Sequence, residues 1–235
     1  MDEGERRART AVRVRVHPVG GSARLSRIIV PEPPLRDTHL SLLLWQHTGA
    51  LTGSREDLWR LGALFRLAAV SPHSAVFVPL RANPRDDHAE GWQQHQGLGD
   101  LLVVRHDTAL RPAHWPALRA RLGRGPRTGT PVRMTAPPPR EPKPEQGWDW
   151  AAHQLAVHEH AATVIMSGTP RALYQAGDDL AWCSGQVSRQ REIRRHGGPA
   201  LLSQWNGPGY PDLPRGRRDT TWECMILAVD PRRQR

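Results

Sequence analysis

The sequence is poor in cysteine and lysine and holds no long apolar run. Its two cysteines, Cys183 and Cys224, are too few for a disulfide scaffold or a four-thiolate zinc site, so we expect two reduced, buried thiols. No apolar run approaches the roughly 20 residues that a membrane-spanning helix needs. The charged first residues have no apolar stretch behind them. We therefore expect no membrane span, no secretory signal and a cytoplasmic location.

Several short motifs of enzyme chemistry are also missing. The sequence has no Walker A pattern, no GxGxxG, no GxSxG elbow, no HExxH and no EF-hand loop. It has no internal repeat at a solenoid period either. These absences exclude the common signatures of nucleotide, flavin, zinc-protease and calcium sites. They leave any cofactor unknown, and we expect no metal site.

Basic residues are abundant, and nearly all of them are arginine. The net charge is +10, and Lys143 is the single lysine among 33 basic residues. The excess lies mainly in a proline-rich stretch, 123–145, and in the segment from Arg191 to the end. One interpretation is a set of arms that contact phosphate, and the other is solvated loops with a compositional bias towards arginine. The first interpretation would use Arg140, the two tryptophans just after the proline-rich stretch (Trp148 and Trp150), and Arg215, Arg217 and Arg218.

The first elements of the fold follow from two kinds of apolar pattern. Alternation over 12–17, a Gly20-Gly21 turn and a second strand over 25–30 predict an antiparallel ribbon. Continuous apolar runs over 39–47, 75–80 and 100–105 are typical of strands that are buried on both faces. Three helices are predicted. The first begins at a capping box formed by Ser54 and Asp57, and the other two span 84–96 and 112–122.

The second half of the chain repeats the strand and helix signals more weakly. A strand over 162–166 and a helix from Thr169-Pro170 are followed by a glycine- and proline-rich loop over 199–216 and a strand over 222–229. We predict an α/β fold with a mixed, mostly parallel sheet, flanking helices and an N-terminal antiparallel ribbon. The expected organisation is a disordered N-terminus (1–10), an α/β core (11–122), a Pro/Arg-rich linker or loop (123–147), the second part of the same domain (148–230) and a basic tail (231–235).

Polar residues follow the predicted buried strands at their carboxyl ends, where parallel sheets form their sites. We expect His106, Asp107 and His47 to be catalytic, with the first two as an acid/base pair. We expect Arg81, Arg105, Ser167 and Thr169 to bind an anion, helped by the helix N-terminus that follows Thr169. The alternative is that polar residues stand there because turns begin there.

Three functions are therefore open. The first is a small-molecule-binding protein or enzyme, such as a hydrolase or transferase, that acts on an anionic or nucleotide-like ligand. The second is a nucleic-acid-binding protein that uses the arginine-rich loop and tail. The third is a structural or partner-binding protein without catalysis.

Overall fold

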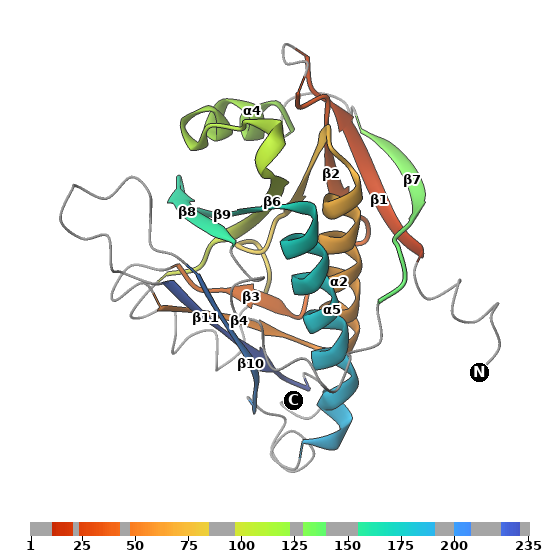
Figure 1. The fold of residues 1–235 in the computed structure, drawn as a ribbon, viewed down its shortest axis with the longest axis vertical. Coiled ribbons are helices and arrows are strands. Elements are labelled where there is room, and N and C mark those ends of the chain that lie inside the picture. The colour runs from red at the N-terminus through yellow and green to blue at the C-terminus, as the bar shows by residue number, and fades with distance from the viewer. Residues whose placement is uncertain are drawn as a thin grey trace.

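The computed structural model describes residues 11–20, 24–42, 48–84, 97–122, 129–139, 155–190, 200–207 and 222–230 of the chain. These residues form two mixed β-sheets, two long helices and one shorter helix (Figure 1). The predicted α/β class is therefore confirmed.

Sheet A has seven strands in the order β7-β1-β2-β5-β6-β9-β8. Strands β1 and β2 form the predicted antiparallel ribbon, and β7 extends it on the other side of β1. The strands are β1 (Ala11–Pro18), β2 (Arg27–Pro31), β5 (Ser74–Val78), β6 (Asp100–Arg105), β7 (Thr130–Thr135), β8 (Ala156–His160) and β9 (Thr163–Gly168).

Sheet B has four strands in the order β10-β11-β4-β3. Its central strands β11 and β4 run parallel, and each has an antiparallel neighbour on its outer side. The strands are β3 (Thr38–Leu40), β4 (Thr48–Gly53), β10 (Ala200–Gly207) and β11 (Trp222–Ala228).

The two long helices begin where their sequences predict. In α2 (Arg55–Val70) the Ser54 hydroxyl accepts a hydrogen bond from the Asp57 amide, and in α5 (Pro170–Gln186) the Thr169 hydroxyl accepts one from the Ala172 amide. Each cap satisfies an amide that has no partner inside the helix. The shorter α4 (Trp115–Leu122) follows a 3-10 turn (Pro112–His114), as the helix signal over 112–122 predicts.

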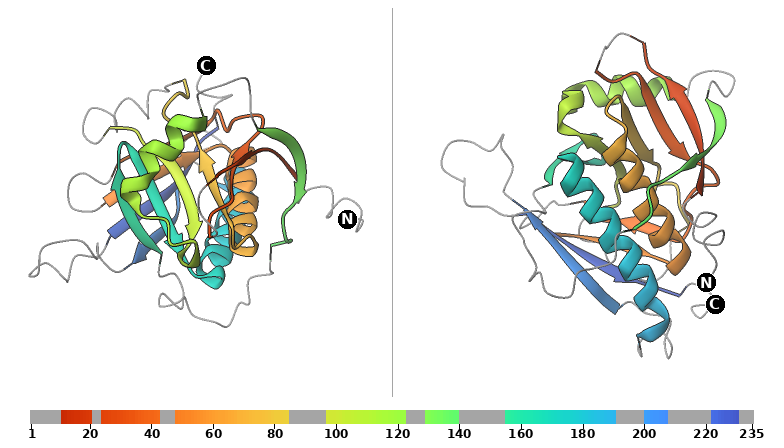
Figure 2. Two further views of the ribbon diagram at one scale, coloured as in Figure 1. Left: turned by 90° about the horizontal axis from the view of Figure 1, so that it is seen from above. Right: turned by 45° about the vertical axis from the view of Figure 1, so that its right-hand side comes forward.

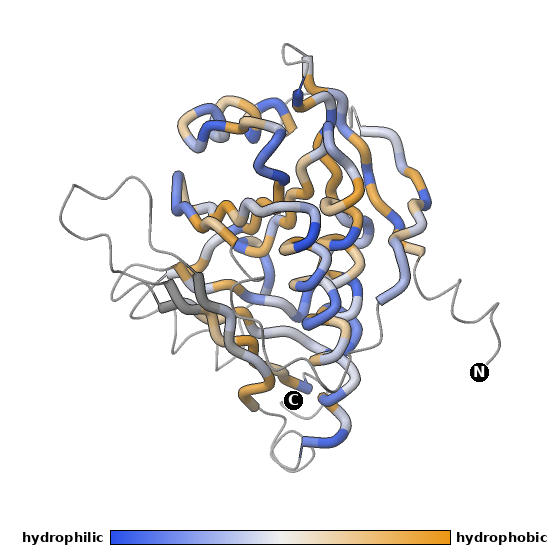
Figure 3. The backbone as a smooth tube through the Cα atoms, in the orientation of Figure 1, coloured by the Kyte–Doolittle hydropathy of each residue, from blue (hydrophilic) through white to orange (hydrophobic). Residues whose placement is uncertain are grey.

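The helices cover both faces of sheet A. Helices α2 and α5 lie side by side and pack against both sheets through one large apolar core (Figure 2). Helix α4 lies on the opposite face of sheet A, where the fully buried Trp115 packs in a second core with Phe77 and Leu102. Figure 3 shows apolar residues gathered in the central strands of sheet A.

The prediction of a mostly parallel sheet is wrong. In sheet A only the β2/β5 and β6/β9 pairs run parallel, and the other neighbours are antiparallel. Strands β5 and β6 are apolar on both faces because helices cover both faces of the sheet. A continuous apolar run indicates that both faces of the strand are covered, but it does not indicate in which direction the neighbouring strand runs.

Two other segments differ from the sequence prediction. The run 39–47 is not one strand, because β3 ends at Leu40 and β4 begins at Thr48. The segments predicted as loops contain β7 and β10, each at a sheet edge. Pro131 lies in β7, and an edge strand tolerates proline because its outward amide has no strand partner. The helix predicted over 84–96 lies outside the described residues from position 85 onwards.

The structure reveals an internal repeat that the sequence search missed. Residues 48–65 align without a gap onto 163–180, and each copy holds a strand, a capped turn and the first half of a long helix. The identical positions include a glycine in the turn and a glycine in the helix. They are Thr48/Thr163, Gly53/Gly168, Leu58/Leu173 and Gly62/Gly177.

The strand pairing repeats in the same way. Strands β5-β6-β9-β8 of sheet A and β10-β11-β4-β3 of sheet B share one order of antiparallel, parallel and antiparallel pairs. The parallel pairs share a register too, since Arg105 lies opposite Gly168 and Ala228 opposite Gly53. With these strands included, one copy is β3-β4-α2-β5-β6 and the other is β8-β9-α5-β10-β11. Each sheet therefore combines the last two strands of one copy with the first two strands of the other.

Candidate functional site

One edge of sheet A gathers most of the predicted site residues. Strands β6 and β9 run parallel and end together, with Arg105 opposite Gly168. His106 and Asp107 follow β6 in a 3-10 turn (His106–Thr108), and Ser167 and Thr169 flank Gly168. The sequence prediction that these side chains lie at one edge is consistent with this register. We call this group the β6/β9 edge.

Arg81 does not belong to the β6/β9 edge. Strand β5 runs antiparallel to β6, so the residues after β5 lie beside the start of β6. There the Asp100 carboxylate accepts hydrogen bonds from the Leu80 and Arg81 amides, both at 3.0 Å. The predicted rim is therefore divided between two opposite edges of the sheet. His47 lies outside the described residues, just before the first strand residue of β4 in sheet B.

The charged pair at the β6/β9 edge serves the fold. Arg105 donates two hydrogen bonds to Asp107, and its Nη1 donates one of 3.2 Å to the Ala69 carbonyl in the last turn of α2. A cation at a helix C-terminus is stabilising because the end carbonyls carry partial negative charge. Asp107 is thus paired with Arg105, and the acid/base pair of His106 and Asp107 stays a prediction. His106 is exposed.

The turn into α5 also satisfies most of its own polar groups. The Ser167 hydroxyl donates to the Ala156 carbonyl at 3.4 Å, and the Thr169 hydroxyl caps the Ala172 amide at 3.2 Å. Pro170 has no amide hydrogen to offer, and the Leu173 amide bonds to the Thr169 carbonyl. Among the first four residues of α5, only the Arg171 amide lacks a hydrogen-bond acceptor within the described part of the chain.

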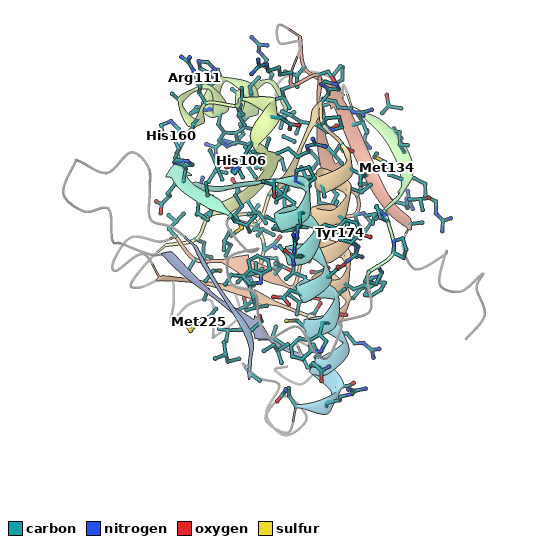
Figure 4. All side chains as sticks on the ribbon, viewed as in Figure 1. His106, Arg111, Met134, His160, Tyr174 and Met225 are labelled. Atoms are coloured by element: carbon teal, nitrogen blue, oxygen red, sulfur yellow. The ribbon has the colours of Figure 1, made fainter. Side chains whose placement is uncertain are left out.

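A different set of arginines has no such partners. Strands β1 and β7 place Arg13 directly opposite Arg133, on the side of sheet A that carries α4. Arg111 and Arg121 are exposed at the two ends of the α4 layer, and Figure 4 shows Arg111 at the outer boundary of the molecule. None of the four has an ion-pair partner among the described residues. We call Arg13, Arg133, Arg111 and Arg121 the arginine face.

The acids on the same side of the sheet are already neutralised. Glu32 accepts a hydrogen bond of 2.6 Å from Arg15, and Asp100 lies 3.4 Å from the Arg119 guanidinium. Two like charges placed directly opposite on neighbouring strands destabilise a sheet. The Arg13/Arg133 pair is therefore expected to cost stability, and neither guanidinium has an ion-pair partner among the described residues.

The two thiols and the Asp57 carboxyl are buried in structural roles. Burial raises the pKa of the Cys183 thiol above its ordinary value and that of Cys224 to about 12, so neither is a ready thiolate. Burial also raises the pKa of Asp57, which joins α2 to the preceding loop by accepting bonds from the Asp37 amide and the Thr38 hydroxyl. No cluster of three His, Cys, Asp or Glu side chains in the described part of the chain is arranged to hold a metal ion.

The predicted nucleic-acid residues all fall outside the described residues. They are Arg140, Trp148, Trp150, Arg215, Arg217 and Arg218. Sequence reasoning overlooked the arginine face, although one signal was present. The alternation that places Val12 and Val14 in the core also places Arg13 on the opposite side of the strand.

Comparison with known proteins gives no relative. No protein-family model matches the chain, and neither does any curated protein or solved structure. Among the helices in the described ranges, none is long and apolar enough to cross a membrane.

Proposed function

We propose that this protein binds nucleic acid through the arginine face, with low specificity for base sequence. The observation that carries the proposal is the set of four exposed arginines on the α4 side of sheet A, which have no acidic partner among the described residues. The acids on that side, Glu32 and Asp100, are both paired with other arginines. The unpaired guanidinium groups are therefore free to bind an anion.

The chemistry of arginine favours phosphate as that anion. A guanidinium group presents a rigid fork of donors that matches phosphate oxygens, and it keeps its charge at every physiological pH. Each phosphate that is neutralised releases a bound counterion, so affinity falls steeply with salt. Arg13 and Arg133 also lie opposite each other on β1 and β7, the last two strands at one edge of sheet A, and both residues are exposed.

The test compares two pairs of charge-removing substitutions. We would measure the binding of a labelled mixed-sequence DNA duplex by fluorescence anisotropy at several salt concentrations. If both arginines contact phosphate, R13Q/R133Q is expected to reduce the slope of log affinity against log salt by about 1.8. The control R171Q/R189Q removes the same charge from exposed positions on α5 and the turn after it.

The two pairs separate a built surface from simple net charge. Equal losses of affinity in R13Q/R133Q and R171Q/R189Q would mean that only the overall charge matters. Binding by the wild type that vanishes at physiological salt would also overturn the proposal. R13Q/R133Q is expected to unfold no more easily than the wild type, because it removes a like-charge pair.

The small anionic ligand at the β6/β9 edge stays a second proposal. The β6/β9 register favours it, because this register places exposed His106 beside the start of α5. Here the H106A variant is expected to lose ligand binding or turnover at an unchanged melting temperature. Screening anionic metabolites against the wild type and H106A tests this. A ligand that binds both proteins equally would remove His106 from the site.

A further inference from the structure

The internal repeat gives each of the four strands of sheet B a counterpart in sheet A. Val104 of β6 lies opposite Ser167, and Leu227 of β11 lies opposite Thr52, at equivalent places in the two parallel ladders. Strands β5 and β10 are therefore counterparts, because each is the antiparallel neighbour of one of these strands. What covers the outer edge of β5 shows what the outer edge of β10 can accept.

The outer edge of β5 is occupied by an extended strand. Strand β2 pairs with it in parallel, from Arg27 opposite Ser74 to Ile29 opposite Val76. Strand β2 sends alternating apolar side chains into the two cores, since Ile28 belongs to one core and Ile29 to the other. At β10, the described residues place no strand on the outer edge.

The exposure of counterpart residues follows this difference. Ala75, which pairs with Val104, is fully buried, whereas Leu201, which pairs with Leu227, is 56% exposed. Trp182 on α5 is 39% exposed, and it lies one helical turn beyond Asp179, whose carboxylate accepts hydrogen bonds from Ser203 and Trp205 of β10. Sheet B therefore leaves apolar surface beside β10 where sheet A buries it.

Figure 4 shows a second sign of the same asymmetry. The Met225 side chain of β11 projects from sheet B on the side away from α2 and α5. Its counterpart Leu102 in sheet A is fully buried under α4. The chain continues from β6 into α4, whereas the two described residues after β11, Val229 and Asp230, are not helical.

We infer that the outer edge of β10 binds an extended segment of a partner protein, which adds a parallel strand to sheet B as β2 does to sheet A. Backbone hydrogen bonds to an open edge supply affinity, and alternate side chains supply specificity. The segment has alternating apolar residues, one set of which covers Leu201. A second copy of this chain fits less well, because a two-fold axis pairs an edge strand with itself in the antiparallel direction.

The probe for this edge is a labelled synthetic peptide with the sequence of residues 24–33, which contains β2 and its flanks. Full-length protein is titrated against the peptide by fluorescence anisotropy, and hydrogen exchange locates the bound peptide. Saturable binding is expected, with new protection of amides in β10 and none in β5. The variant L201K is expected to weaken binding by at least about tenfold, because a lysine on an edge strand opposes strand addition.

The matched control is V132K. Val132 is also an exposed apolar residue on an edge strand, β7, at 40% exposure, so V132K adds the same charge elsewhere and is expected to leave affinity unchanged. Absence of saturable binding, or equal affinity for L201K and wild type, would overturn the inference. Concentration-dependent self-association that L201K abolishes would assign the edge to a second copy and would also overturn it.

Discussion

Gly62 and Gly177 bring α2 and α5 into direct backbone contact. A Cβ atom on Gly62 would lie 2.6 Å from the Gly177 carbonyl oxygen, and a Cβ atom on Gly177 would lie 2.6 Å from the Gly62 oxygen. Real Cβ atoms essentially never come within 3.0 Å of another heavy atom. The obstacle is backbone on both sides, so a rotamer change cannot relieve it and the helices must move apart.

The cost of this movement exceeds the gain in helix propensity. Overpacking a well-packed core costs about 1–3 kcal/mol, and a backbone obstacle on both helices places this case near the upper value. Replacing glycine by alanine inside a helix returns about 1 kcal/mol. G62A is therefore expected to lower the free energy of unfolding by about 2 kcal/mol, which in a chain of this size lowers the melting temperature by about 4–8 °C.

Urea denaturation of three variants and a double variant checks this reasoning. G177A is expected to lose at least as much as G62A, because its Cβ also meets Arg66 Cγ at 2.7 Å. The control G185A lies in α5 with nothing within 4 Å of its Cβ and is expected to be neutral or to gain up to about 1 kcal/mol. G62A/G177A should lose less than the sum, since one separation serves both. A stabilised G62A would refute the contact.

Three further predictions concern buried polar groups. Arg66 is fully buried, and its Nη2 has no hydrogen-bond partner in the described part of the chain. The free energy of unfolding of R66M is therefore expected to lie within about 1 kcal/mol of the wild type, and that of R66A to fall by about 3 kcal/mol. Urea denaturation curves that rank the two variants in reverse would contradict this. Burial and the charge of Arg15 lower the pKa of His17 below its ordinary 6.5, so the unfolded chain protonates first. Stability is then full above pH 6.5 and falls as the pH drops below it. H17Q should flatten that fall in denaturation curves taken across this range. Cys183 and Cys224 are buried with raised pKa values, so a colorimetric thiol reagent should label neither until denaturant is added.

Local chemistry made much of the fold predictable. Ser54 and Thr169 are residue types that cap helices, and Pro170 fits the first helical position, so both long helices begin where the sequence indicates. Strand β6 has the predicted bounds because its apolar run ends at a charged residue, Arg105. Strand direction depends on how distant segments pair, and no local pattern records it. The antiparallel β5/β6 pair was therefore missed.

For the candidate site too, the sequence indicated which residues follow each strand, but not which distant residues they contact. The sequence identified the residues that follow β6 and β9, and the parallel pairing brings them together. It did not reveal that Arg105 takes Asp107 as its partner and also donates to Ala69 in α2. Residue type alone cannot tell an arginine that serves the fold from one that is free. Only contacts make that distinction: Arg105 is paired with Asp107, whereas the arginines of the arginine face have no ion pair among the described residues.

The repeat is hard to detect in the sequence because only a few, widely spaced positions require a particular residue type. A strand that leads into a capped helix needs a small turn residue and a cap, and a close helix crossing needs a glycine on each helix. Most other positions accept any apolar residue of suitable size. The two copies therefore keep Gly53/Gly168 and Gly62/Gly177 while most other positions differ. Because the copies exchange strands between two sheets, neither copy is expected to fold without the other, and the glycine pair lies where the backbones of their two helices meet.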